Sequence, residues 1–425
     1  MHRAVPASLC LVLLATATPA AAADDPGAPL QWGMARIGAE AAWATGQGAG
    51  TTIAVIDTGI DIDHEDLTGR VLPGRDLVDD DDIAQDEEGH GTHVAGVAAA
   101  ASGNGLGVIG VAPEALLLPV RVLDASGQGT LEDVAAGVRW ATEQAADVIN
   151  LSLGPERRDL EPHPTSAAAL REAIDDAWAA GIVIVLAAGN DETLGLTDSS
   201  PAIVVAATDR ADQASKFAAD ADNDLGDAAF GMAAPGGQAG DTVETCATAP
   251  SGILSTYRAD GGGSYACLAG TSMAAPHVAG AAAVLLGLGL DPVATRDRLL
   301  ATAVDLGAPG PDPVYGAGRL DVTAAVAGGG MAPPPADRAP GPPVQPGVTG
   351  SSTGSATVVP GEQVGTDGDR LRRDGGAPAG APVALDGLPN QEPDGIPPAP
   401  ALVAAALIVV VAGGGIWSRR ANSSA

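Results

Sequence analysis

Short apolar runs alternate with amphipathic stretches between about residues 30 and 326. Two amphipathic stretches, 130–144 and 166–180, predict helices, because each opens on a capping residue or an acidic first turn. Runs rich in Val, Ile, Leu and Ala predict buried strands at 52–56, 116–122, 148–151, 182–187 and 203–207. This alternation predicts a three-layer α/β fold with a mainly parallel central sheet and helices on both faces.

Polar residues come directly after two of the predicted strands. Asp57 follows the strand at 52–56, and Asn190 follows the strand at 182–187. In open parallel sheets, sites form beyond the carboxyl ends of the strands. We therefore expect both side chains at one edge of the sheet.

The two ends of the chain carry patterns that are typical of targeting rather than of a folded core. Residues 1–23 combine Arg3, a short apolar run and a final Ala-Ala-Ala, which predicts a secretory signal peptide. A tract of Pro, Gly, Ala, Ser and Thr at 331–398 predicts a disordered linker. The apolar stretch 399–417, followed by Arg419 and Arg420, predicts a transmembrane helix with a cytoplasmic tail at 418–425.

The folded part is therefore expected at 24–330, outside the cell membrane, in a single-pass type I topology. A cell-wall sorting signal is the alternative for the C-terminal end, because Leu388-Pro389-Asn390 matches the start of such a signal. The Thr-Gly that should follow is missing from this sequence.

Charge and composition narrow the classes of partner. The 425 residues include 53 Asp and Glu against 21 Lys and Arg, giving a formal net charge of −32. So acidic a chain repels polyanions, so we expect no nucleic-acid partner. Aromatic residues are only 2%, so the core must be aliphatic. The acidic run at 79–82, continued by 86–88, predicts a solvated or calcium-associated loop, or alternatively a cleft that favours basic substrates.

Cysteine usage agrees with export. Cys10 lies in the predicted signal, which leaves Cys246 and Cys267 in one Gly-rich stretch. An even pair in an exported domain predicts a disulfide, with two small buried thiols as the alternative.

Three separated motifs offer an acid, a histidine and a serine in that order. Asp57 lies in Val-Ile-Asp-Thr-Gly, His90 in Gly-His-Gly-Thr-His, and Ser272 in Gly-Thr-Ser-Met-Ala-Ala-Pro-His. A hydroxyl attacks a carbonyl well only when an imidazole takes its proton and a carboxylate holds that imidazole. Small residues around each candidate let backbone and substrate come close.

Each motif also has another interpretation. Asp-Thr-Gly occurs in aspartic peptidases, but their chemistry needs two such carboxylates and this chain has one Asp-Thr-Gly. His90 and His93 could be metal ligands, yet they lack the Glu and the spacing of the zinc-peptidase helix. Ser272 alone would be an ordinary residue at a helix start.

The order and the local sequences of the three motifs resemble those of subtilisin-like serine peptidases, the subtilases. The resemblance covers about residues 30–326 and implies the subtilisin-like fold and a serine endopeptidase that needs no cofactor for catalysis. It implies that Ser272 is the nucleophile, His90 the base and Asp57 the residue that orients the base. Asn190 and the backbone N–H of Ser272 would hold the oxyanion.

The resemblance also implies where the substrate and a metal bind. Ser152, Leu153 and Gly154 resemble the edge that pairs with an extended peptide. Ala188 and Gly189 would wall the first pocket, and their small size predicts a broad, apolar preference. Structural calcium is implied at Asp66 and Asn104, with Gln31 as a weaker third ligand.

Together these features predict a membrane-anchored, monomeric, extracellular endopeptidase that acts on polypeptides. We expect no classical pro-domain, because only about thirty residues separate the predicted signal from Asp57. The topology is similar to that of mycosins, so a dedicated processing protease of secreted proteins is an alternative. A non-catalytic surface adhesin on the same fold is another.

Overall fold

The structure is a computed structural model that describes residues 24–153, 164–190, 201–216, 225, 230–258, 264–328 and 370–372. The chain divides into two units, 1–387 and 388–425, and the second lies outside the described residues. The predicted signal peptide, transmembrane helix and cytoplasmic tail also lie outside them. Within the described ranges, no helix has the length and apolar character needed to cross a bilayer.

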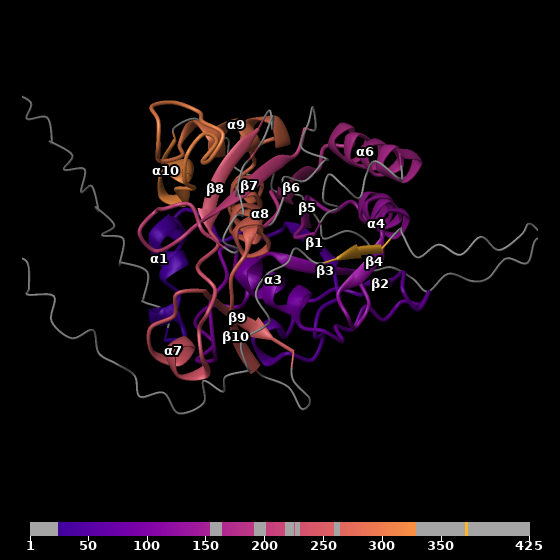
Figure 1. Ribbon diagram of the computed structural model, residues 1–425, viewed down its shortest axis with the longest axis horizontal. Coiled ribbons are helices and arrows are strands. Elements are labelled where there is room, and N and C mark those ends of the chain that lie inside the picture. Colours follow the sequence, from indigo (N-terminus) through magenta and orange to yellow (C-terminus); the bar gives the residue numbers. More distant parts are fainter. Residues whose placement is uncertain are drawn as a thin grey trace, which may run out of the picture. The chain divides into compact units, whose positions relative to one another are not determined.

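A seven-stranded sheet forms the centre of the first unit, in the order β2-β3-β1-β5-β6-β7-β8 (Figure 1). All of its strand pairs are parallel. The predicted α/β fold class is therefore confirmed, and the five predicted strands appear within one residue at each end; the sequence analysis did not predict β2 and β8. The strands are β1 Thr52–Asp57, β2 Arg75–Asp76, β3 Leu116–Arg121, β5 Val148–Leu151, β6 Val183–Ala187, β7 Ile203–Thr208 and β8 Gly231–Pro235.

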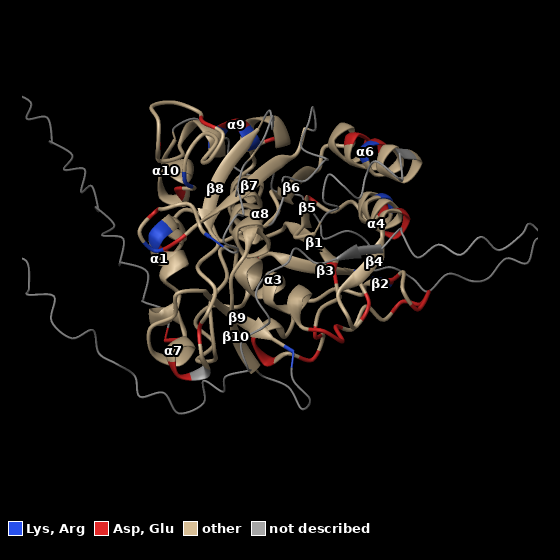
Figure 2. Ribbon diagram, in the orientation of Figure 1, with Lys and Arg blue, Asp and Glu red and all other residues tan. Residues whose placement is uncertain are grey.

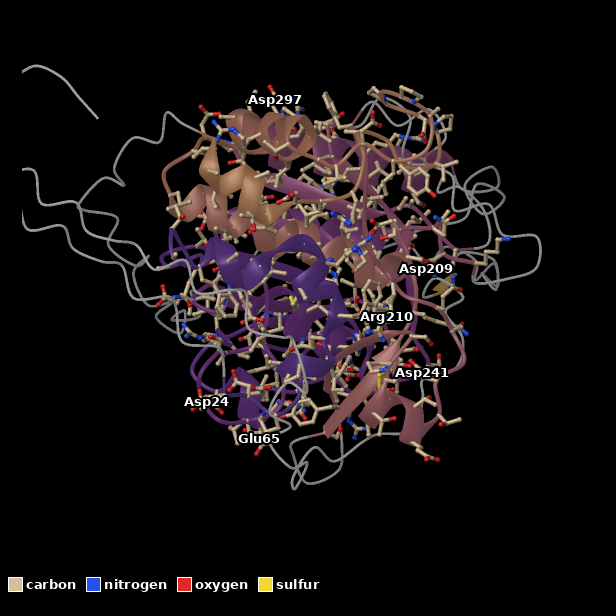
Figure 3. All side chains as sticks on the ribbon, turned by 90° about the vertical axis from the view of Figure 1, so that its left-hand side faces the viewer. Asp24, Glu65, Asp209, Arg210, Asp241 and Asp297 are labelled. Atoms are coloured by element: carbon tan, nitrogen blue, oxygen red, sulfur yellow. A yellow bond between two sulfur atoms is a disulfide. The ribbon has the colours of Figure 1, made fainter. Side chains whose placement is uncertain are left out.

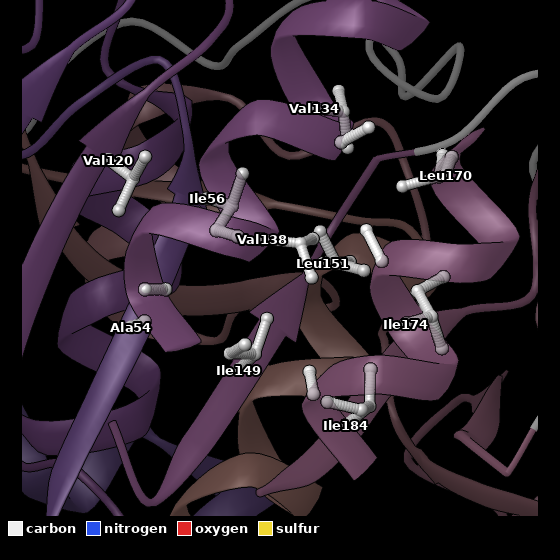
Figure 4. Close-up of a cluster of buried hydrophobic side chains, with 14 of the residues drawn as sticks. Ala54, Ile56, Val120, Val134, Val138, Ile149, Leu151, Leu170, Ile174 and Ile184 are labelled. Atoms are coloured by element: carbon white, nitrogen blue, oxygen red, sulfur yellow. The ribbon is translucent and has the colours of Figure 1, made fainter. Parts of the chain in front are cut away.

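One face of the sheet is covered by the two predicted helices. They are α4 Leu131–Glu143 and α6 Pro164–Ala179, which lie side by side in Figure 1. The Thr130 hydroxyl accepts a hydrogen bond from Asp133 N–H and caps α4. Alternate residues of the strands point into this layer, among them Ala54 and Ile56 of β1 (Figure 4). The cluster consists of aliphatic residues, as the composition predicts.

The other face of the sheet is covered by α3 His90–Ala99 and α8 Thr271–Gly287. Because side chains alternate along a strand, Asp57 points to this second face when Ile56 points to the first. Nearly every residue of α8 is buried, and Gly280 of α8 lies against Ala98 of α3. The two helices whose first turns carry His90 and Ser272 therefore pack against each other.

An antiparallel hairpin, β9 Ile253–Tyr257 and β10 Ser264–Leu268, packs on α3. A disulfide joins Cys246 in the short helix α7 (Val243–Thr248) to Cys267 in β10. The predicted cysteine pairing is confirmed. The bond ties the loop before β9 to the strand that leads to Ser272.

The remaining elements were not predicted from the sequence. A second small sheet pairs β4 Gln128–Thr130 with β11 Arg370–Arg372. The strand β11 lies inside the tract that the sequence predicted to be a linker. The other elements are short helices: η1 Ala28–Leu30, α1 Trp32–Ile37, α2 Ala39–Ala42, η2 Glu65–Leu67, α9 Pro292–Ala301 and α10 Val322–Ala327.

Candidate active site

Asp57 and His90 form a buried pair at the carboxyl end of β1. Nδ1 of His90 lies 2.8 Å from Oδ1 of Asp57, and the two side chains are 5% and 0% exposed. The backbone N–H of Thr58 donates to the same carboxylate oxygen at 2.7 Å. A carboxylate at Nδ1 selects the tautomer that carries its proton there, which leaves Nε2 as the basic nitrogen.

Two glycines allow His90 to start α3 close to β1. Gly89 has a φ of 118°, and a Cβ atom there would lie 2.5 Å from the ring of Tyr257. A Cβ atom on Gly91 would overlap the carbonyl oxygen of Gly59. Gly91 therefore lets α3 approach the end of β1, and Gly89 lets the start of α3 approach Tyr257 of β9.

Asp86 holds the loop that leads into α3, a role that the sequence analysis did not find. Its side chain is fully buried and accepts hydrogen bonds from the backbone N–H groups of Glu88, Gly89 and Thr92 and from the Thr58 hydroxyl. Burial raises the pKa of Asp86, and these donors offset only part of that rise. Its place in an acidic run concealed it, because the neighbouring carboxylates are exposed or half-buried.

Ser272 is the second residue of α8 and is 2% exposed. Its Oγ donates to the carbonyl oxygen of Ser152 at 3.0 Å, and the Ser152 hydroxyl donates to the Ser272 carbonyl at 2.8 Å. Asn150 Nδ2 donates in turn to the Ser152 hydroxyl. These reciprocal bonds hold the start of α8 against the end of β5, the strand beside β1.

Asn190 is bound at one end and unpaired at the other. Its Oδ1 accepts from the backbone N–H and the hydroxyl of Thr271, at 2.9 and 3.1 Å. Its Nδ2 is buried and has no hydrogen-bond partner within the described part of the chain. A Cβ atom on Gly270 would lie 3.3 Å from that nitrogen. A buried amide donor without an acceptor is unfavourable unless a ligand supplies the oxygen.

The predicted substrate-contact residues lie around this point where they are described. Ser152 and Leu153 follow β5 and are buried, whereas Gly154 lies outside the described residues. Ala188 is 1% exposed, and the N–H of Gly189 donates to the Thr271 hydroxyl at 3.1 Å. The two segments thus approach α8 from neighbouring strands.

The structure brings the two predicted calcium ligands into contact. Nδ2 of Asn104 donates to Oδ1 of Asp66 at 2.8 Å, and Val108 N–H donates to the other oxygen at 2.7 Å. Burial raises the pKa of Asp66 to about 7, and the nearby charge of Asp25 adds to this shift. Gln31 lies in the same region, because it exchanges two hydrogen bonds with the backbone of Ile109.

Asp25 is an acid at this site that the sequence analysis did not single out. It is 1% exposed and accepts from three consecutive backbone N–H groups, those of residues 103–105. Two buried carboxylates that repel each other, beside an amide side chain, suit a hard cation. No cluster of three His, Cys, Asp or Glu side chains suited to a metal occurs among the described residues.

His93 and His277 have structural roles. Nε2 of His93 faces the carbonyl oxygens of Ile253 and Ala266, which ties α3 to the hairpin β9–β10. Burial lowers the pKa of His93 to about 3 and that of His277 to about 4. Both rings are therefore neutral at physiological pH.

The acidic run at 79–82 lies in the loop after β2, where the ribbon in Figure 2 is largely red, the colour of Asp and Glu. Part of it is paired: the buried Arg121 binds Asp76, Asp79 and Glu87 at 2.6 to 2.7 Å. These pairs anchor the loop to the end of β3, next to β1. The run is thus more than a solvated face.

Known proteins match both the sequence and the fold. The profile of the Subtilase family matches residues 48–318. Thermitase from Thermoactinomyces vulgaris is 41% identical over 262 residues, which cover 61% of this chain and 83% of thermitase. Subtilisin DY of Bacillus licheniformis is 38% identical over 304 residues, 69% of this chain and 97% of that protein. A solved protease structure from Pseudoalteromonas arctica has a TM-score of 0.58 at 32% identity and covers 72% of this chain and 98% of its own.

Proposed function

The chain belongs to the subtilase family and is a serine endopeptidase, and from this premise we propose that Ser272, His90 and Asp57 form its catalytic triad. The buried hydrogen bond between Asp57 and His90 carries the assignment. A carboxylate that is 0% exposed and bonded to an imidazole stabilises the imidazolium that forms when His90 accepts a proton. The packing of α3 against α8 supports the addition of Ser272 to this pair.

In the first step, Ser272 Oγ attacks the carbonyl carbon of the scissile peptide while His90 Nε2 takes the hydroxyl proton. The carbonyl oxygen becomes an oxyanion, and two donors bind it. One is Asn190 Nδ2, whose buried N–H has no protein acceptor in the described chain. The other is the backbone N–H of Ser272 at the positive end of the α8 dipole.

In the second step, the C–N bond breaks and His90 gives its proton to the leaving amine. The acyl group remains on Ser272 as an ester. A water molecule then attacks this ester with His90 again as the base, and the product acid leaves with the serine proton restored. Asp57 keeps its negative charge throughout.

We also propose that an extended peptide binds by strand addition against residues 152–154. The small residues Ala188 and Gly189 favour a roomy first pocket and a broad apolar preference. Calcium, with Asp25, Asp66 and Asn104 as side-chain ligands, would supply the positive charge that two buried carboxylates lack. Its role is structural, since the region is built from the loop after α3 and the N-terminal segment rather than from the triad.

The cellular setting is a further proposal from the sequence. The signal pattern at 1–23 and the apolar stretch at 399–417 support export and a membrane anchor, with the enzyme outside the cell as a monomer. The disulfide supports an oxidising compartment.

Labelling with a fluorophosphonate probe tests the proposed triad directly. We expect one adduct, mapped by mass spectrometry to Ser272, and hydrolysis of denatured casein by the same preparation. The Ser272→Ala chain should give neither. A folded native chain that takes up no label would contradict the assignment and favour a non-catalytic surface protein.

A further inference from the structure

A segment far along the chain pairs with an edge strand of the enzyme. The strand β11, Arg370–Arg372, runs antiparallel to β4, Gln128–Thr130 (gold arrow, Figure 1). The register sets residue 370 against Thr130, residue 371 against Gly129 and residue 372 against Gln128. The two strands form a sheet of their own, separate from the central one.

A single segment of backbone, residues 122–124, separates β4 from Asp57, the acid of the proposed triad. The N–H groups of Val122 and Leu123 donate to the carbonyl oxygen of Asp57, at 2.9 and 3.2 Å. Leu123 forms an antiparallel bridge with Gly129, and Asp124 N–H donates to the Gln128 carbonyl at 2.8 Å. Four backbone segments therefore lie next to one another in this order: the end of β1 at Asp57, residues 122–124, β4 and β11.

Gly129 is needed for this close stacking. A Cβ atom at this position would overlap the carbonyl oxygen of Val122. One side of β4 is bonded to 123–124, so its other side would be an open edge if β11 were removed, and its three residues are only half-buried. An open edge of this kind binds extended chains by main-chain hydrogen bonds.

This edge and the start of α8 share one end of the central sheet. β3, β1 and β5 are parallel neighbours, so their carboxyl ends at Arg121, Asp57 and Leu151 point the same way. β4 follows β3 at this end, and Ser152, which contacts Ser272, follows β5 there. A strand laid on β4 therefore lies over the end of the sheet where the peptide bond is cut.

We propose that the segment containing Arg370–Arg372 is an intramolecular competitor of the substrate: it occupies the β4 edge, and a polypeptide must displace it to be cleaved. This inference rests on the proposed function, because it takes the extended peptide that binds at residues 152–154 to contact the β4 edge as well. The ligand class is an extended peptide, and in the free enzyme the chain itself supplies it.

Charge supports this occupant. Arg370, Arg372 and Arg373 put three basic residues within four positions, the densest basic run in an otherwise acidic sequence. The loop after β2 carries exposed carboxylates at Asp79, 62% exposed, and Glu87, 52% exposed, both bound to Arg121 at the end of β3. Opposite charge across such a surface favours encounter of a basic strand over an acidic one.

Because β11 belongs to the same chain as β4, even a weak affinity between them is sufficient for competition with a separate peptide. About 40 residues separate Gly328 from Arg370, so β11 meets β4 within one chain. Such a tether gives an effective concentration of about 1 mM. A strand that binds in trans with a Kd of about 0.1 mM would then raise the apparent Kd of a competing peptide about tenfold.

The test uses the full chain with Ser272→Ala, so that no tail is cut. The probe is a fluorescein-labelled synthetic peptide of residues 367–376, and its Kd is measured by fluorescence anisotropy. A Leu371→Pro/Arg372→Pro pair removes two consecutive N–H donors, one of which faces β4. The matched control is Val358→Pro/Val359→Pro, which places the same change in the tail outside β11.

We expect the 371/372 pair to lower the probe Kd about tenfold and the 358/359 pair to leave it unchanged. Equal Kd values in all three chains, or no probe binding to any of them, would overturn the proposal. With Ser272 restored and an intact tail verified by mass, the 371/372 pair should lower the KM for a chromogenic peptide with kcat unchanged. Loss of all hydrolysis together with the expected Kd change would refute the proposed function alone.

Discussion

At the residue scale, the site is defined by hydrogen bonds that the surrounding residues leave incomplete. The carboxylate of Asp57 is committed to His90, whereas the Asn190 amide has its oxygen bound to Thr271 and its nitrogen unpaired in the described chain. In the proposed mechanism, the first arrangement prepares a base, and the second prepares a donor for charge that exists only during the reaction. Both are built before substrate arrives, so the enzyme need not reorganise them.

Asn190→Ala tests the donor. We expect kcat to fall by about 10²–10³, the range known for removing one oxyanion donor in subtilisin itself, with little change in KM, because the bond forms only in the transition state. Steady-state hydrolysis of a peptide substrate measures both constants. Thr295→Ala is a suitable control, since it removes another buried polar group that lacks a partner among the described residues, in α9 and outside the three motifs. A rise in KM with kcat intact would instead assign Asn190 to ground-state binding.

Asp66 couples the proposed calcium site to pH. Its folded pKa, raised to about 7 by burial, exceeds the unfolded value near 4, so the folded state holds this proton more tightly. Without a cation, the contribution of Asp66 to stability is therefore lost as pH rises from about 4 to 7. Calcium, which binds the ionised carboxylate, should reverse the trend and bind more tightly as pH rises.

Thermal unfolding with EDTA or with excess calcium, at pH 5 and pH 8, measures this coupling. We expect calcium to raise the Tm more at pH 8 than at pH 5, and Asp66→Asn to lose most of the difference. Glu65→Gln, a neighbouring acid in the same short helix, is the matched control. A calcium effect of the same size in the Asp66→Asn chain would place the ion elsewhere.

At the scale of elements, long apolar patterns were predictable and short irregular ones were not. β1, β5 and α4 were found because a buried strand or an amphipathic helix repeats one chemical choice over several residues. β2 has two residues and β4 has three, too few for any period to appear. β11 was hidden for a different reason: its composition gives no reason to expect a strand, and only its partner β4 makes it one.

The candidate site was predictable to the same extent. Motif sequences pointed to the residues of the proposed triad, and for His90 the structure shows why its neighbours are small: Gly91 lets the helix approach the end of β1, and Gly89 lets it approach Tyr257 of β9. The sequence analysis did not find Asp25 and Asp86, because each acts by accepting hydrogen bonds from backbone N–H groups. Backbone donors are the same for every sequence, so no pattern of side chains marks their acceptors.

The disulfide is an element-scale feature whose effect on stability can be estimated from the length of the loop that it closes. Cys246 and Cys267 are 21 residues apart, and closing a loop of this length stabilises a fold by about 3 kcal/mol through the entropy of the unfolded chain. Cys246→Ser/Cys267→Ser should lower the free energy of unfolding by that order in urea titrations. Dithiothreitol should destabilise the parent chain by a similar amount and leave the double variant unchanged. Equal midpoints for the oxidised parent and the variant would show that the bond contributes nothing.

At the scale of the whole molecule, an aliphatic core is combined with a strongly acidic composition. The core is aliphatic, and the surface shown in Figure 3 carries acidic side chains such as Asp24, Asp241 and Asp297 at well-separated places. Arg121 and its three carboxylates form the largest ion-pair group in the described ranges, at the end of β3. Arg121 thus holds a loop near the proposed site. With 53 acidic residues against 21 basic ones, most carboxylates in the sequence cannot be paired one to one with a cation.

A formal net charge of −32 should make stability depend on ionic strength in a definite direction. Like charges repel most strongly in the compact state, so screening them favours folding, whereas exposed ion pairs such as Arg75–Asp82 weaken in salt. With 53 acidic residues against 21 basic ones, the repulsion outweighs the pairs. We expect the Tm to rise by several degrees between about 20 and 500 mM NaCl, where the Debye length falls from about 20 Å to about 4 Å. Calorimetry at fixed saturating calcium measures this, with choline chloride at equal ionic strength to separate screening from specific sodium binding. A Tm that falls in both salts would mean that the ion pairs, and not the excess of negative charge, dominate the electrostatics of the fold.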